Sequence, residues 1–228
     1  MPVSLSVLIV NYNGASFIEE TIQSCVKNLN LIEGLKFEIL ILDNCSNDNS
    51  VQVLKDIEGR GVDFTLKVWY SKENTGFAKG CNILAKEATN EVLFLLNNDT
   101  KVISLDDLGR YLTLNENIAS TIATTNILNK DGTPQNNLFS YPTFIKMFLE
   151  LFMCRHLVKR LLGRWVDFNN ENKVVNGNNY FSGCVLFIHS KLFRELGGFD
   201  EGFYFYHEEC DLFLRAEKQV QLKKIYLK

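Results

Sequence analysis

The sequence contains no long hydrophobic run, no closely spaced cysteine pair and no large excess of charge of either sign. Its longest apolar stretches, such as residues 92–96, are far shorter than the roughly 20 residues that a helix needs to cross a bilayer. The net charge is −3, so the chain lacks the overall basic character of nucleic-acid-binding proteins. These absences exclude a membrane span and argue against a nucleic-acid partner.

Cysteine and histidine are few and scattered. None of the six cysteines forms a CxxC pair, and His156, His189 and His207 do not pair with a cysteine at zinc-ligand spacing. Isolated thiols in a chain of 228 residues are typical of a reduced, cytosolic protein. The first residues also lack the basic lead-in of a signal peptide, so we expect a cytoplasmic location.

The first hundred residues alternate between apolar runs and amphipathic segments. Apolar runs that predict strands occupy residues 5–10, 37–42, 64–70 and 92–96. Segments with helical spacing of apolar side chains occupy residues 18–29, 51–57 and 77–88. This alternation predicts an α/β fold with a mainly parallel sheet flanked by helices. Right-handed crossovers would then bring the carboxyl ends of the strands to one edge, where such sheets bind ligands.

The second half is less regular, and no linker divides the chain into two domains. A turn is predicted over residues 129–132. Further strands are predicted over residues 119–128, 180–188 and 222–228, and helices over residues 143–165 and 208–218. The basic, apolar helix at 143–165 has two interpretations: a peripheral contact with an anionic membrane surface, or packing on the core. We favour the core because apolar helix faces usually pack there.

Polar side chains follow all four predicted strands of the first half. Loops after strands are rich in Asn and Asp for local reasons, so each cluster alone also has a purely structural interpretation. Because the topology gathers all four at the ligand-binding edge, we favour a binding site there. The clusters are Asn11-Tyr12-Asn13, Asp43-Asn44, Glu73-Asn74 and Asn97-Asn98-Asp99.

Acidic side chains in two regions of the sequence suit metal binding or general-base catalysis. Asp99 follows an apolar strand, where a carboxylate can bind a hard divalent cation shared with substrate phosphates, although it can also cap the next turn. Near the end of the chain, Glu208, Glu209 and Asp211 are crowded together, which raises the pKa of at least one carboxyl group and suits a general base. The alternative is an acidic first helical turn in which Arg215 pairs with Asp211.

These clusters belong to five longer motifs: VSLSVLIVNYNG, EILILDNCSNDNS, ENTGFAKGCN, VLFLLNNDT and SGCVLFIHSKLFRELGGFDEGFYFYHEECDLFLR. In this order they resemble the family 2 glycosyltransferases, in particular the bacterial rhamnosyltransferase-like branch. The resemblance covers nearly the whole chain and is looser over residues 103–175. It implies a single GT-A domain, Rossmann-like, with a smaller acceptor-side sub-region, in which residues 1–100 form the nucleotide-binding half and residues 101–228 the acceptor half.

The resemblance also implies an activity: inverting transfer of a sugar, hexosyl or rhamnosyl, from a nucleotide-diphosphate sugar to a hydroxyl of a glycan or lipid-linked acceptor, assisted by Mg²⁺ or Mn²⁺. Asp99 would be the metal ligand, in a DXD-like motif whose first position is Asn97. Glu209 would be the base, with Glu208 and Asp211 as alternatives. The residues implied to bind the nucleotide sugar are Asn11, Tyr12, Asn13, Asp43, Asn74, Lys79, Asn82, Asn97 and Asn98.

The chain departs from the family in two respects. Lys228 precedes the histidine that completes the metal site in many members, and it precedes their C-terminal helices, so we expect a truncated acceptor half. Two other functions stay open. A sugar-phosphate nucleotidyltransferase would have a Gly-rich, Arg-bearing loop where this chain has Asn-Tyr-Asn-Gly. A non-catalytic nucleotide-sugar-binding protein would explain Asn97 and the missing histidine.

Overall fold

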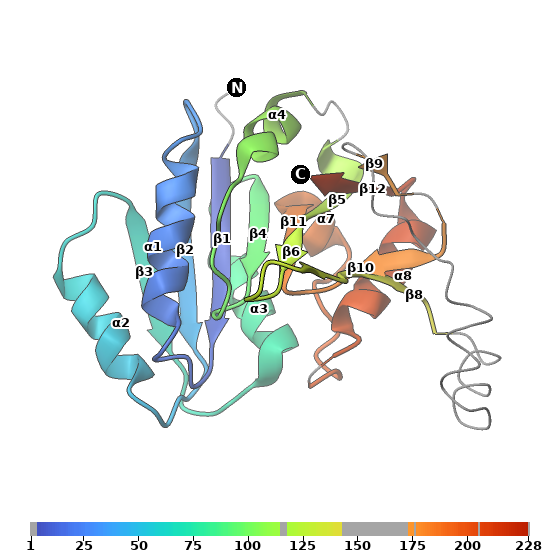
Figure 1. Ribbon diagram of the computed structural model, residues 1–228. Coiled ribbons are helices and arrows are strands. Elements are labelled where there is room, and N and C mark those ends of the chain that lie inside the picture. Colours follow the sequence, from blue (N-terminus) through green and yellow to red (C-terminus); the bar gives the residue numbers. More distant parts are fainter. Residues whose placement is uncertain (1–3, 115–117, 143–172, 176, 205, 228) are drawn as a thin grey trace.

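One eight-stranded sheet forms the centre of the protein, with the strand order β3-β2-β1-β4-β11-β5-β12-β9 (Figure 1). The computed structural model describes residues 4–114, 118–142, 173–175, 177–204 and 206–227. The strands of the first half confirm the prediction closely: they are β1 (Ser4–Asn11), β2 (Lys36–Asp43), β3 (Thr65–Tyr70) and β4 (Val92–Leu96).

The sheet is mainly parallel, as predicted. Strands β1 to β4 are parallel, and β5 (Thr121–Thr125) and β12 (Lys223–Leu227) run in the same direction. Two strands run the other way: β11 (Val185–His189), between β4 and β5, and the edge strand β9 (Lys173–Val174). Because β11 is antiparallel to β4, its first residues lie beside the last residues of β4, at the predicted ligand-binding edge.

Helices cover both faces of the sheet, because the side chains of the central strands are apolar on both sides. Val7 and Ile9 of β1 contact one layer of helices, and Leu8 between them contacts the other. The first layer comprises α1 (Ile18–Leu29), α2 (Ser50–Gly59) and α4 (Asp106–Leu114). The second comprises α3 (Gly76–Glu87), α7 (Ser190–Glu195) and α8 (Glu208–Gln219).

The second half contains two small two-stranded sheets. Strands β6 (Ile127–Leu128) and β7 (Pro134–Gln135) form a hairpin, whose turn closes where Gly132 N–H donates to the Asn129 carbonyl at 2.9 Å, as predicted. Strands β8 (Leu138–Ser140) and β10 (Asn179–Phe181) form the other. The predicted strand over 119–128 is wrong as one element. The 3-10 helix Ile118–Ser120 precedes β5, and β6 belongs to a different sheet from β5.

The predicted strand over residues 180–188 is also wrong, because it is two strands in different sheets. Phe181 of β10 packs edge-on against Phe213 of α8, whereas β11 enters the central sheet. The chain changes sheet over residues 182–184, where Gly183 faces the start of α8. Ser182-Gly183 is a turn signal at this point, but the apolar residues on both sides of it predict one strand, because both pieces are buried.

The predicted helix over residues 143–165 lies outside the described residues. In the part of the chain that the structure describes, no helix has both the length and the apolar character that a membrane span requires.

Candidate functional site

The polar side chains at the ends of β1, β2 and β4 form one hydrogen-bonded network. Asn11 Nδ2 donates to the Asp43 carboxylate at 2.9 Å, and Asn98 Nδ2 donates to Asn11 Oδ1 at 2.9 Å. Ser46 donates to Asp43 from its hydroxyl at 2.7 Å and from its backbone N–H at 3.0 Å. Three of the predicted clusters therefore meet at one edge. Asn11 and Asp43 are buried, and these contacts use their polar atoms within the protein.

Tyr12 and Asn13 stand on the exposed rim above this network. Asn13 has a left-handed backbone (φ 52°), and its N–H donates to the Ser46 hydroxyl at 2.9 Å. Its side-chain oxygen accepts from the Asn47 N–H at 2.9 Å. Asn13 thus joins the loops that follow β1 and β2, and Tyr12 is the exposed side chain that this turn presents at the edge.

Asn44 organises the loop before α3, a role that the predicted site list did not include. Its Nδ2 donates to Asn74 Oδ1 at 3.0 Å and to the Gly76 carbonyl at 3.1 Å, while its Oδ1 accepts from the Thr75 N–H at 2.9 Å. Asn74 is therefore brought to the edge and held there. The only signal in the sequence was the position of Asn44 directly after β2.

Helix α3 begins beside the loop that leads to α8. Gly76 is left-handed (φ 80°), and a Cβ there would lie 2.7 Å from the Tyr204 carbonyl oxygen. Lys79 is half-buried in the first turn of α3. The start of this helix, with its N–H groups and a lysine, thus lies next to the downstream motif, which suits an anionic ligand between them.

The Asn97–Asp99 segment adjoins the start of β11. Asn97 N–H donates to the Cys184 carbonyl at 3.0 Å, and the Asn98 carbonyl accepts from the Thr21 hydroxyl at 2.8 Å. The Asp99 side chain is exposed, and among the described residues no cation lies within ion-pair distance of it. Its carboxylate is accordingly open to a ligand.

Glu208 and Glu209 form a buried acid pair in the first turn of α8, with side chains that are 5% and 9% exposed. Burial raises the pKa of Glu208 to about 7, and the neighbouring Glu209 charge adds to the effect. Burial also raises the pKa of Glu209. Hydrogen bonds donated to its carboxylate by the Gly183 N–H and by the Glu208 carboxyl oppose this rise. The pKa of both carboxyl groups is therefore raised by burial, and the hydrogen bond from the Glu208 carboxyl to Glu209 favours the proton on Glu208.

One oxygen of each of these carboxyl groups is buried with no hydrogen-bond partner among the described residues. The two residues before the helix, Tyr206 and His207, are both left-handed (φ 68° and 71°). Buried oxygens without a partner cost free energy, and so does a left-handed backbone at residues with large side chains. Such costs concentrate at functional sites. The acid pair and the two residues before it therefore combine both kinds of cost.

Cys184 links the acid pair to Asp99. Burial raises the pKa of the Cys184 thiol, and the charges of Asp99 and Glu209 add to the effect. A Cβ on the adjacent Gly183 would lie 3.8 Å from Glu208 Oε1 and 3.9 Å from Glu209 Cβ. The segment Gly183–Cys184 therefore adjoins both acidic regions, and the two regions that a sugar would have to bridge belong to one edge of the sheet.

Two predicted site residues have their polar atoms committed within the protein. Asp211 accepts from Arg215 Nε at 2.7 Å, which is the structural alternative that its spacing indicated. Asn82 is buried in α3 and pairs with the backbone of Phe199 in both directions, at 2.9 Å each. The Asn82 amide is thus directed to the protein backbone, whereas the resemblance implied that it binds the nucleotide sugar. This pairing could not be foreseen, because Phe199 lies 117 residues away along the chain.

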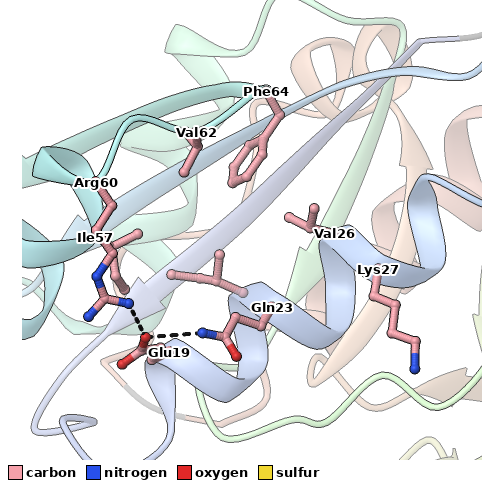
Figure 2. Close-up of a pocket in the computed structure, with 9 residues that line it drawn as sticks. Glu19, Gln23, Val26, Lys27, Ile57, Arg60, Val62 and Phe64 are labelled. Atoms are coloured by element: carbon pink, nitrogen blue, oxygen red, sulfur yellow. Dashed lines mark hydrogen bonds and ion pairs between the residues drawn. The ribbon is translucent and has the colours of Figure 1, made fainter.

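A cavity of about 320 Å³ lies elsewhere, between α1, α2 and the segment before β3 (Figure 2). Apolar side chains dominate its lining, and Arg60 forms an ion pair with Glu19 at its margin. None of the predicted site residues lines it. The cavity is therefore separate from the edge that carries the acidic groups.

A family model and a curated relative match most of the chain. The family model described as "Glycosyl transferase family 2" matches residues 6–154. The chain is 26% identical over 220 residues to the low-salt glycan biosynthesis hexosyltransferase Agl10 of Haloferax volcanii, covering 94% of this chain and 62% of Agl10. The chain spans less than two thirds of the length of the curated relatives that it matches.

Solved structures show the same fold at low identity. GalNAc-T7 with UDP, GalNAc and Mn²⁺ matches with a TM-score of 0.66 and 17% identity, over 99% of this chain and 42% of that one. TarS 1–349 of S. aureus in complex with UDP matches with a TM-score of 0.60 and 17% identity, over 99% of this chain and 58% of that one. The predicted GT-A fold is confirmed.

Proposed function

The chain belongs to glycosyl transferase family 2, and from that premise we propose that it transfers a sugar from a nucleotide-diphosphate sugar to an acceptor hydroxyl with inversion. The observation that carries this proposal is the position of the segment Gly183–Cys184, which accepts from the Asn97 N–H at 3.0 Å on one side and faces Glu208 and Glu209 on the other. A donor that lies across the edge would meet Asp99 at its diphosphate and the acid pair on the other side of its sugar. Such an arrangement suits a single displacement.

In the proposed mechanism Glu209 is the base. The acceptor oxygen attacks the anomeric carbon from the face opposite the diphosphate, and its proton passes to Glu209 as the bond to the diphosphate oxygen breaks. The transition state resembles an oxocarbenium ion, as in glycoside hydrolysis. The Glu208 carboxyl donates a hydrogen bond to Glu209, which favours the ionised form of Glu209 that accepts the proton.

The residues at Asp99 fit a divalent cation, Mg²⁺ or Mn²⁺. In the described ranges no three His, Cys, Asp or Glu side chains gather as a metal site. We propose the exposed Asp99, which has no ion pair among these residues, as the carboxylate ligand. One carboxylate together with substrate phosphates is a common arrangement for such ions. When bound, the ion neutralises charge on the diphosphate leaving group. Asn97 would add only a neutral oxygen, and Lys79 a positive charge from α3.

The donor and acceptor classes follow from the relatives. UDP is bound in the solved structures of GalNAc-T7 and TarS, which supports a pyrimidine nucleotide at the edge formed by Asn11, Tyr12 and Asp43. Agl10 is named for glycan biosynthesis, which supports a glycan or lipid-linked acceptor. We propose a hexosyl or rhamnosyl donor and action at the cytoplasmic face of a membrane.

A second candidate is a non-catalytic protein of the same fold that binds nucleotide sugars. It is favoured by the single carboxylate at the DXD-like position, where Asn97 replaces the first acid. The two candidates share a donor site and differ only in turnover.

A donor panel followed by a turnover assay tests both. We expect one nucleotide sugar to raise the melting temperature most in the presence of Mn²⁺, because binding to the folded state stabilises it. That donor should release nucleotide diphosphate when a polyprenyl-linked or oligosaccharide acceptor is added. Stabilisation without release across the acceptor panel would favour the binding protein. The absence of stabilisation by every nucleotide sugar would contradict both candidates.

A further inference from the structure

We infer that Asn82 is a positioning residue that pairs α3 with the turn at Gly198–Glu201 and thereby holds the acid pair Glu208–Glu209 in place beside the nucleotide-binding half. The catalytic consequence rests on the proposed function, whereas the contact itself does not. This role differs from a donor contact, because the Asn82 side chain is directed to the chain's own backbone.

The contact is a two-way pairing of a side-chain amide with a backbone amide. Asn82 Nδ2 donates to the Phe199 carbonyl at 2.9 Å, and Asn82 Oδ1 accepts from the Phe199 N–H at 2.9 Å. Asn82 Nδ2 also donates to Glu201 Oε1 at 3.1 Å. The Asn82 side chain is 6% exposed, so these bonds are shielded from water and their loss would leave buried polar groups unpaired.

The turn is shaped to receive this amide. Gly197 and Gly198 are both left-handed (φ 80° and 76°), a conformation that side chains other than glycine rarely adopt. A Cβ on Gly198 would lie 2.4 Å from Asn82 Oδ1. Glycine at 198 is therefore required both by the backbone conformation and by the approach of Asn82.

Further contacts make the turn rigid on its other sides. The Phe199 ring packs between Phe77 of α3, at 6.1 Å, and Phe193 of α7, at 5.4 Å between ring centroids. Arg215 of α8 donates to the Gly198 carbonyl at 2.9 Å and also to the Leu196 carbonyl. The turn is thus bonded to α3 by Asn82 and to α8 by Arg215.

A short path connects this turn to the acid pair. Only six residues separate Glu201, the last partner of Asn82, from Glu208. Within that path the Tyr204 carbonyl lies against Gly76, at the start of α3. The Glu208 charge also reaches Cys81, the neighbour of Asn82 in α3, where it adds to the effect of burial in raising the pKa of that thiol. A shift of the turn would therefore move the acid pair relative to α3.

The test uses Asn82→Ala in the full chain, with three measurements. Hydrogen–deuterium exchange of residues 198–204 should rise, because the turn loses its bonds to α3. The kcat for transfer should fall about tenfold or more, since a small misplacement of reacting groups is costly. The Kd for UDP with Mn²⁺, measured by calorimetry, should stay within about twofold of wild type, because the UDP contacts are elsewhere.

Asn28→Ala is the matched control. Asn28 is 8% exposed, and its Nδ2 donates to the carbonyls of Ser24 and Val102 at 2.9 and 3.0 Å, in the last turn of α1. It loses comparable buried hydrogen bonds, so it corrects for a general loss of stability. With this control, exchange at 198–204 and kcat should both stay at the wild-type level below the melting temperature.

Gly198→Ala provides an independent perturbation of the same contact. It should lower kcat as Asn82→Ala does, because its Cβ would displace Asn82 Oδ1. In the Asn82→Ala background that clash is relieved, so Gly198→Ala should cost less there than in the wild type. Equal costs in the two backgrounds would contradict the inferred contact.

The outcomes separate this inference from the proposed function. An unchanged kcat in Asn82→Ala overturns the inference, as does a UDP affinity weakened about tenfold, which would indicate a donor contact. A wild-type protein that transfers to no acceptor overturns the proposed function alone. In that case increased exchange at 198–204 still supports the contact, and unchanged exchange still overturns it.

Discussion

The polar groups at the ends of β1 and β2 and those at the start of α8 are held in opposite ways. Asn11 and Asp43 are buried but hydrogen-bonded, within a network that also includes Asn98. Glu208 and Glu209 are just as buried, yet one oxygen of each has no partner among the described residues. A satisfied network stabilises a loop, whereas an unpaired buried carboxyl group costs folding free energy. The contrast favours a framework role for the first pair and proton transfer for the second.

Replacing Glu209, the proposed base, is expected to have the largest effect. It tests most directly whether the buried acid pair acts in proton transfer. Glu209→Gln keeps the shape of the side chain and removes its ability to accept a proton. We expect kcat to fall by about 10²- to 10⁴-fold, the range typical of a lost general base. The Kd for UDP should not change. Steady-state kinetics and calorimetry measure the two quantities, and full activity in this variant would transfer the role of base to Glu208 or Asp211.

Asp99→Ala tests the exposed end of the site. The side chain is exposed, so stability should change by less than about 0.5 kcal/mol. The metal-dependent gain in UDP affinity should fall about tenfold or more, since the only proposed carboxylate ligand is lost. Titration calorimetry with and without Mn²⁺ measures that gain. Asp63→Ala, at another exposed carboxylate, is the control that should leave it intact.

The raised pKa of Glu208 should make the free energy of unfolding depend on pH, which tests the buried state of the acid pair. Its pKa is raised from 4.5 to about 7, so between these values the folded protein binds more protons at this site than the unfolded chain. The stabilisation is complete below about pH 4.5 and is lost as the pH rises through 7, with a slope of at most about 1.4 kcal/mol per pH unit. Glu208→Gln lacks this proton, so the difference in unfolding free energy between wild type and variant should fall with that slope as the pH rises from 4.5 to 7.

Urea denaturation at several pH values measures that difference. The comparison with the variant isolates the coupled pair Glu208–Glu209, because Glu38 and Asp48, whose pKa values are lowered, contribute equally to both proteins. A difference that does not vary between pH 4.5 and 7 would mean that Glu208 titrates normally in the folded state.

Much of the fold was predictable because local signals and tertiary structure agree. The run Val92–Leu96 is apolar throughout, and it forms a strand with those bounds since both faces of the sheet are covered. The clusters at Asn11, Asp43 and Asn98 were predicted to meet, and they do, because parallel strands end at one edge. The break at Gly183 was missed, although Ser182-Gly183 is a turn signal, since the short apolar segments on both sides of it resemble one continuous strand.

The roles of individual polar side chains were less predictable. Asp211 and Asn82 have the residue types of ligands, and the structure pairs them with Arg215 and with the Phe199 backbone. The motif order and the family implied the chemistry of the site. The choice between a ligand and an internal partner depended on distances that spacing does not encode.

The sequence alone determined the order of strands and helices, the apolar layers and the edge at which polar residues gather, because these follow from periodicity and from the handedness of crossovers. Only the tertiary structure decided which polar atoms are satisfied and which are left unpaired. The burial of Glu208 and the partner of Asn82 both depend on segments more than twenty residues away along the chain. Desolvation and hydrogen bonding act through space, so they appear only once the chain is folded.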